Sequence, residues 1–166
     1  MSAKTIGFIG VGMMGGPMAG RLVDAGYGMT ICDVDDAAAE ALVAKGATRV
    51  ETAKEVADRE ETVLVSLPTP NVVHQIALGN TGLSEGSKIK DYIDLSTTGS
   101  VMANQVADGL EEKGINVLDC PVSGGVRGAE AGSVSYTHLR AHETLRYRVC
   151  RVLVGKKRGG GGGGGG

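Results

Sequence analysis

The sequence Thr5-Ile-Gly-Phe-Ile-Gly-Val-Gly-Met-Met-Gly15 joins an apolar run of strand type to a glycine-rich turn, Gly10-x-Gly12-x-x-Gly15. From Met14 to Ala25 apolar residues recur at helical spacing, and Gly26 is placed to end that helix. Short glycine motifs recur by chance in unrelated proteins, so the turn gains its meaning from the strand before it and the helix after it.

An acidic residue, Asp33, stands 18 residues after Gly15, at the end of a second predicted strand. In a dinucleotide-binding turn the three glycines allow a tight turn, close approach of a pyrophosphate, and packing of helix on strand. The positive end of the helix faces the phosphates, and a carboxylate such as Asp33 accepts hydrogen bonds from the ribose hydroxyls. No arginine follows Asp33, so we expect NAD rather than NADP. The alternative is that the glycines only make a turn and that Asp33 caps the next helix.

The rest of the sequence alternates predicted strands and helices. The predicted strands are Met29–Cys32, Thr62–Leu67, part of Ile89–Leu95 and Ile115–Leu118, with a weaker one near Arg49 and Val50. The predicted helices are Asp35–Lys45, capped by Asp35, a short one from a Thr52–Glu55 capping box to Asp58, Asn71–Leu78 and Val101–Lys113. This alternation requires parallel pairing through crossover helices, so it predicts an α/β fold: a Rossmann-type, doubly wound, mostly parallel sheet.

The composition is that of a globular protein, with 166 residues of which 42% are hydrophobic and 22% charged. It excludes an intrinsically disordered chain and, because the glycines have no period of three, collagen. No apolar run reaches the roughly 18 residues of a membrane span, and no signal peptide is readable, so we expect a cytoplasmic protein without a membrane partner. The three cysteines, Cys32, Cys120 and Cys150, are far apart, so neither a disulfide framework nor a metal site is predicted.

The charges are distributed unevenly along the chain. Residues 1–134 carry 10 Lys+Arg and 18 Asp+Glu, a net charge of −8, whereas residues 135–158 carry 7 Lys+Arg and one acid. The acidic part would repel a phosphate backbone, so we expect no nucleic-acid partner. The break predicts a boundary, with residues 1–134 as an NAD-binding domain and residues 135–166 as a non-native-looking, disordered tail of basic residues and glycines.

Four motifs in order resemble the β-hydroxyacid dehydrogenases, the family of 3-hydroxyisobutyrate dehydrogenase and tartronate semialdehyde reductase. They are Gly7-Phe-Ile-Gly-Val-Gly-Met-Met-Gly-Gly-Pro-Met-Ala19, Leu67-Pro-Thr69, Asp94-Leu-Ser-Thr97 and Asp119-Cys-Pro-Val-Ser-Gly-Gly-Val126. The resemblance covers about Lys4 to Val134. It implies a cofactor domain that is followed in the family by an all-helical domain, before which this chain would be truncated.

The resemblance also implies roles for individual residues. The cofactor would be bound by the turn and the strand ends that follow it: Gly10, Gly12, Met13, Met14, Gly15, Asp33, Leu67, Pro68 and Thr97. The substrate carboxylate would be held by Ser123, Gly124 and Gly125, with Ser123 the catalytic residue that orients the substrate.

Each of these roles has a plainer alternative from the residues alone. Leu67 and Pro68 can simply end a strand, residues 96–98 can cap the helix that follows, and residues 123–125 can form an ordinary turn. Cys120 is expected to be a small packed side chain rather than a nucleophile, and His74 a solvated helix residue. The methionines at 13, 14 and 18 are expected to line the core and the groove.

Oxidising a hydroxyl group by hydride transfer also requires a proton acceptor. In the family this is a lysine in a Gly-Lys-x-x-x-x-Asn context, which is absent from this sequence. We therefore expect this fragment to lack the catalytic lysine and to be inactive by itself.

The tail suggests why that context is missing. From Ser135 the sequence resembles translated sequencing-adapter read-through, and the final run 159–166 resembles a poly-G artefact. The alternative is a basic helix from about Leu139 to Leu153, with a flexible glycine linker, that binds an anionic partner.

Two functions compete at this point. The first is the cofactor domain of an oxidoreductase that transfers hydride between NAD and a small 3-hydroxy acid, the parent protein being a homo-oligomer. The second is a non-catalytic dinucleotide-binding module. A methyltransferase-like α/β domain with a similar glycine turn is a third, which the later motifs disfavour.

Overall fold

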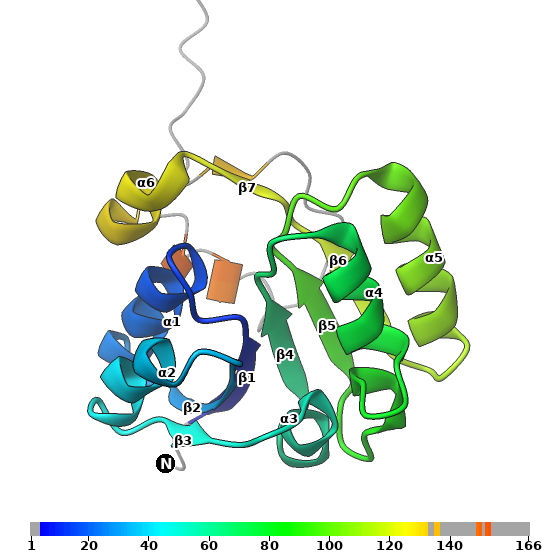
Figure 1. Ribbon diagram of the computed structural model, residues 1–166, viewed down its shortest axis with the longest axis horizontal. Helices are drawn as coiled ribbons and strands as arrows, with labels where there is room; N and C mark the ends of the chain where they lie inside the picture. Colours follow the sequence, from blue (N-terminus) through cyan, green and yellow to red (C-terminus); the bar gives the residue numbers. More distant parts are fainter. Residues whose placement is uncertain (1–3, 133–134, 137–148, 151, 154–166) are drawn as a thin grey trace, which may run out of the picture.

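The computed structural model describes residues 4–132, 135–136, 149–150 and 152–153. Its centre is a six-stranded parallel sheet in the order β3-β2-β1-β4-β5-β6, shown in Figure 1. The strands are β1 (Thr5–Ile9), β2 (Gly28–Cys32), β3 (Thr48–Arg49), β4 (Thr62–Val65), β5 (Asp91–Asp94) and β6 (Asn116–Asp119). The chain runs outward from β1 to β3 and returns to β4 beside β1, so the strand order reverses between β1 and β4. In open α/β sheets, ligands bind outside the carboxyl ends of the strands at such a reversal.

Helices cover both faces of the sheet. They are α1 (Gly15–Asp24), α2 (Asp36–Val43), α3 (Ala53–Arg59), α4 (Pro70–Leu78), α5 (Ser100–Glu111) and α6 (Gly125–Ala131), with a short 3-10 helix at Leu83–Glu85. Strand β4 shows the two-layer core: Leu64 packs in the cluster under α1 and α2, whereas Val63 and Val65 pack in the cluster under α3, α4 and α5. Because successive strand residues point to opposite faces, an uninterrupted apolar strand serves both layers. The predicted doubly wound α/β fold is confirmed.

Side-chain caps begin three of the helices. Asp35 accepts hydrogen bonds from the backbone N–H groups of Ala37 and Ala38, and Thr52 accepts one from Glu55, as the sequence predicts. Thr69 does the same at the start of α4, with Pro70 in the first helical position. The alternative reading of residues 96–98 as a cap of α5 is wrong. The residue before that helix is Gly99, whose positive φ of 76° suits glycine, and no side chain of the described residues caps it.

The structure adds elements that the sequence pattern does not predict. Strand β7 (Val122–Ser123) pairs antiparallel with β8 (Ser135–Tyr136), and α6 starts two residues after Ser123. Residues 123–125 thus form the short connection between β7 and α6, and the alternative of an ordinary turn there stays open.

Some residues beyond 134 take part in the described structure. Val149, Cys150 and Leu153 are buried in the same core cluster as α1, and Arg21 Nε donates a hydrogen bond to the carbonyl oxygen of Val152 at 3.3 Å. The division at residue 134 stays a prediction, and most of the predicted tail and basic helix lies outside the described residues.

Cys120 is a packed side chain, as the sequence predicts, and is fully buried. The hydrogen bond that the protonated Cys120 thiol donates to Cys150, together with burial, raises the pKa of Cys120. A thiol with a raised pKa stays protonated at neutral pH, so it is a poor nucleophile.

One polar pair lies within the core between β2 and the end of α3. Thr30 Oγ1 donates to Glu60 Oε1 at 2.6 Å, and Glu60 Oε2 has no hydrogen-bond partner among the described residues. Thr30→Val removes the donor but keeps the volume, which leaves a buried carboxylate unpaired. We expect the free energy of unfolding, measured by urea denaturation, to fall by about 2–3 kcal/mol. Thr30→Ser keeps the hydroxyl and is the control: equal losses in the two variants would mean that the hydrogen bond contributes nothing.

Candidate functional site

The three glycines of the turn after β1 have different surroundings. Gly10 has a φ of +84°, and a Cβ there would lie 2.1 Å from the carbonyl oxygen of Ser66. A Cβ on Gly15 would lie 1.7 Å from the carbonyl oxygen of Gly10. At Gly12 a Cβ would meet no described atom within 4 Å. Two of the glycines are thus required by the protein's own packing, whereas the third leaves open space where a ligand can approach the backbone.

The start of α1 directly follows this turn. Met14 precedes the helix without a side-chain cap, and no acidic residue of the described part stands in its first turn. Asp35, Thr52 and Thr69 supply such a cap to the next three helices. The positive end of the helix dipole therefore has no acidic partner among the described residues beside the open face of Gly12, while the N–H of Gly16 donates to the Gly12 carbonyl oxygen at 2.8 Å. This arrangement suits an anion with the dimensions of a pyrophosphate.

The methionines of the turn divide between surface and core. Met13 is 80% exposed beside Gly12, whereas Met18, within α1, is fully buried. Met14 lies between them, partly buried against the core.

Asp33 lies at the end of β2 and is bonded to the turn. Its Oδ2 accepts a hydrogen bond from the backbone N–H of Val11 at 2.6 Å, and its Oδ1 accepts one from Asp35 at 2.8 Å. The cap of α2 is Asp35, so the alternative role of Asp33 as a helix cap is wrong. The carboxylate is held beside the glycine-rich turn, where the hydroxyls of a ribose could donate hydrogen bonds to its remaining lone pairs.

Leu67 and Pro68 follow the end of β4, across the reversal of strand order from Asp33. A Cβ on Gly10 would lie 3.0 Å from Leu67 Cδ2, so the Leu67 side chain lies against the turn. The backbone N–H of Leu67 donates to Ser96 Oγ at 2.9 Å. This hydrogen bond ties the end of β4 to the segment after β5.

The segment after β5 is organised by the buried carboxylate of Asp94. It accepts hydrogen bonds from Ser96 N at 2.8 Å, Thr98 Oγ1 at 3.0 Å and Tyr92 Oη at 3.2 Å. Burial raises the pKa of Asp94 in spite of these donors, and burial beside Asp94 raises the pKa of Tyr92. Ser96 and Thr98 are buried, so the residue between them, Thr97, is the exposed one.

A cavity of about 430 Å³ lies at the carboxyl ends of β5 and β6. It brings together two residues that the resemblance implies for the nicotinamide side and the substrate, Thr97 and Ser123. Residues 96–100, Asp119, Pro121 and Val122 complete its lining. Gly124 and Gly125 follow Ser123 with positive φ angles of 128° and 63° and do not line this cavity.

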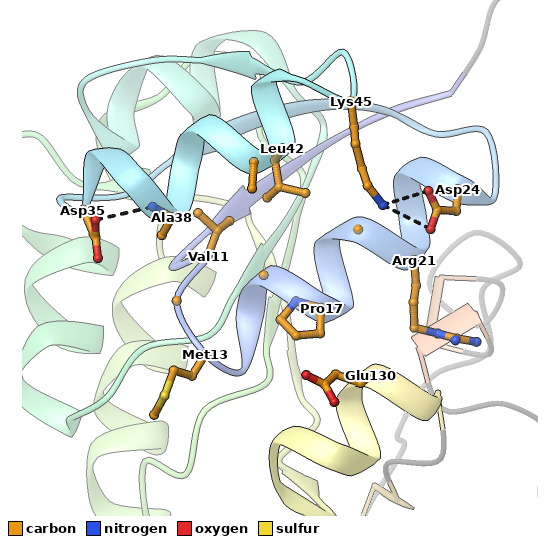
Figure 2. Close-up of a pocket in the computed structure, with 14 residues that line it drawn as sticks. Val11, Met13, Pro17, Arg21, Asp24, Asp35, Ala38, Leu42, Lys45 and Glu130 are labelled. Atoms are coloured by element: carbon orange, nitrogen blue, oxygen red, sulfur yellow. Dashed lines mark hydrogen bonds and ion pairs between the residues drawn. The ribbon is translucent and has the colours of Figure 1, made fainter.

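A larger cavity of about 640 Å³ lies between α1 and α2, shown in Figure 2. Val11, Gly12 and Met13 line one part of it, and the ion pair between Lys45 and Asp24 (3.1 Å) lies at another. Asp33, Leu67 and Thr97 do not line it, so it meets the predicted cofactor site only at the glycine-rich turn.

One residue near the predicted ribose site is missed by sequence reasoning. Arg49, in β3, donates from Nη2 to Asp36 Oδ1 at 2.5 Å and to the carbonyl oxygen of Asp33 at 3.3 Å. The search for an arginine next to Asp33 in sequence cannot find it. The pairing of β2 with β3 in the sheet brings Arg49 to Asp33, and a prediction of that pairing would have identified it.

Within the described residues, no group of three or more histidine, cysteine, aspartate or glutamate side chains is placed to hold a metal ion. No helix of that part has both the length and the apolar character needed to cross a bilayer.

Comparison with known proteins gives a family match and relatives of known activity. The model of the NAD-binding domain of 6-phosphogluconate dehydrogenase matches residues 5–138. A 3-hydroxyisobutyrate dehydrogenase of Pseudomonas aeruginosa is 39% identical over 132 residues, which are 79% of this chain and 44% of that protein. The chain thus spans less than half the length of this relative.

Solved structures agree with the sequence match. Mycobacterium tuberculosis 3-hydroxyisobutyrate dehydrogenase with L-serine aligns with a TM-score of 0.82 and 32% identity, over 93% of this chain and 53% of that one. Psf3 in complex with NADP+ and 2-OPP aligns with a TM-score of 0.72 and 26% identity, over 79% and 47% of the two chains.

Proposed function

The chain belongs to the family of NAD-binding domains that includes that of 6-phosphogluconate dehydrogenase, in the form found in β-hydroxyacid dehydrogenases, and from this premise we propose that it binds NAD across the carboxyl ends of β2, β1, β4 and β5. The observation that carries the proposal is the open face of Gly12 beside the uncapped start of α1, with Asp33 bonded to the same turn. These features suit a pyrophosphate and the adjoining ribose.

Each predicted cofactor residue has a place along this path. Gly10 and Gly15 keep the turn tight, and Gly12 leaves room for the pyrophosphate. Asp33 accepts hydrogen bonds from the ribose hydroxyls. Met13, Met14, Leu67 and Pro68 line the apolar sides, and Thr97 faces the nicotinamide end. Residues from four different strand ends act together because the parallel sheet places all these ends on one edge.

We propose further that the longer protein oxidises a small 3-hydroxy acid. When bound, NAD supplies the hydride acceptor. Ser123, with the backbone of Gly124 and Gly125, would hold the substrate carboxylate near Thr97, which shares a cavity with Ser123. The proton of the oxidised hydroxyl goes to a base that the recognised motifs of this chain do not include, so the fragment itself is inactive.

The preference for NAD over NADP is part of the proposal. The carboxylate of Asp33 would face a 2′-phosphate with like charge. A relative that binds NADP+ has a similar fold, so the preference depends on the local charges and requires measurement.

Calorimetric titration of the whole chain with NAD, beside an activity assay with 3-hydroxyisobutyrate, tests the function. We expect NAD binding without turnover. Absence of NAD binding would overturn the proposal, and turnover would show that the base is present after all. NAD binding with no activity in any longer form of the protein would favour the alternative, a non-catalytic dinucleotide-binding module.

Gly12→Val tests the pyrophosphate position. The added side chain points into open space, so we expect the thermal midpoint to change little while the dissociation constant for NAD rises at least about tenfold. Calorimetry and thermal unfolding of the same sample separate the two effects. A variant that binds NAD as tightly as the wild type would place the pyrophosphate elsewhere.

A further inference from the structure

The guanidinium of Arg49 lies at the end of β2, beside the position proposed for the adenosine ribose. Its Nη2 bonds both to the carbonyl oxygen of Asp33 and to the carboxylate of Asp36. We propose that Arg49 is a 2′-phosphate-binding cation that Asp36 masks, so that Asp36 sets the preference of this site for NAD over NADP. The inference rests on the proposed NAD-binding function.

The geometry places the cation where cofactor selectivity is decided. The Asp33 carbonyl belongs to the same residue whose carboxylate is proposed to bind the ribose, and the bond to it is 3.3 Å long. NADP differs from NAD only by a phosphate on the 2′-hydroxyl of that ribose. Because Arg49 contacts the backbone of the residue proposed to bind the diol, its guanidinium would lie within reach of that phosphate.

The local chain holds Arg49 in this orientation. Its side chain is 27% exposed, and its Nε is buried without a hydrogen-bond partner among the described residues. The stem of Arg49 is thus enclosed, and only the tip of the guanidinium reaches the surface. Asp36, in contrast, is 79% exposed in the first position of α2, so its removal leaves no buried group unpaired.

The surrounding charges explain why Arg49 would not favour NADP in the wild type. Asp33, Asp35 and Asp36 lie within four residues, and Arg49 is bonded to the last of them at 2.5 Å. A 2′-phosphate would meet a net negative site and would have to displace the Asp36 carboxylate from the guanidinium. Without the charge of Asp36, the planar guanidinium is free to form charge-assisted hydrogen bonds to the phosphate.

The test compares the ratio of the dissociation constants for NADP and NAD, measured by calorimetry on the whole chain. Asp36→Asn is expected to lower this ratio about tenfold, mainly through tighter NADP binding. Arg49→Met in the Asp36→Asn background should restore the wild-type ratio, and Arg49→Met alone should change it less than about twofold, since the cation is already masked.

Asp24→Asn is the matched control. Asp24 is exposed and paired with Lys45 at 3.1 Å on α1, so this variant also removes one carboxylate from one surface ion pair. We expect it to leave the ratio unchanged. An equal change in the Asp24 and Asp36 variants, or a gain in NADP affinity that survives Arg49→Met, would overturn the inference while NAD binding by the wild type still stands. A wild-type chain that binds neither dinucleotide would overturn the proposed function and this inference together.

Discussion

Replacing Gly15 by alanine is expected to lower the free energy of unfolding by about 3–4 kcal/mol. The new Cβ would lie 1.7 Å from the carbonyl oxygen of Gly10 and 3.2 Å from the ring of Phe8. A backbone atom cannot swing aside as a flexible side chain can, so the turn between β1 and α1 has to open. For a domain whose total stability is on the order of 5–15 kcal/mol, such a loss removes a large part of it.

Gly20→Ala is the matched control for this substitution. Gly20 lies in the same helix and is also buried, but its Cβ would meet only Lys45 Nζ among the described atoms, at 3.7 Å. Because alanine favours a helix interior over glycine, we expect Gly20→Ala to stabilise the fold by roughly 0.5–1 kcal/mol. Urea denaturation of both variants measures the difference. Similar stabilities would mean that the close packing at Gly15 is not required.

The fold was predictable because its signals are local. An apolar strand, a glycine turn and an amphipathic helix follow one another within residues 5–25, and Asp35 and Thr52 cap their helices through neighbours two or three residues away. The parallel pairing of the strands follows from their alternation with helices. The short helix α6 was missed because its seven residues include two glycines. Those residues have low helix propensity, and tertiary packing decides the outcome.

The family was predictable because its signals lie within four short stretches of sequence. The resemblance to β-hydroxyacid dehydrogenases, drawn from four motifs, is confirmed by the family match and the relatives. The roles given to individual site residues stay predictions.

Contacts between motifs were not predictable in the same way. The hydrogen bond from Leu67 to Ser96 and the reach of Arg49 to Asp33 join residues 29 and 16 positions apart. They depend on the adjacency of β4 with β5 and of β2 with β3, which no single stretch of sequence contains.

Asp94→Ala is expected to cost about 2–4 kcal/mol of unfolding free energy, because it leaves three buried donors unpaired. Those donors are the N–H of Ser96 and the hydroxyls of Tyr92 and Thr98. The loss also releases Ser96, which holds Leu67 at the proposed cofactor path, so NAD affinity should fall as well. Urea denaturation and NAD titration measure the two effects. A variant as stable as the wild type would mean that water or another group satisfies these donors.

Asp94→Asn separates the hydrogen bonds from the charge. The amide oxygen of asparagine can still accept from Ser96, and its NH₂ can donate to the two hydroxyls, which reverse their roles. Because burial raises the pKa of Asp94 in the folded state, its ionisation costs stability. The contribution of the protonated carboxyl is complete below the unfolded pKa of about 3.9 and is lost as the pH rises through the folded pKa. The asparagine variant should therefore gain stability relative to the wild type as the pH rises from about 4 toward neutrality. A difference that stays constant over this range, or one that shrinks, would mean that the folded state does not disfavour the charged form of Asp94.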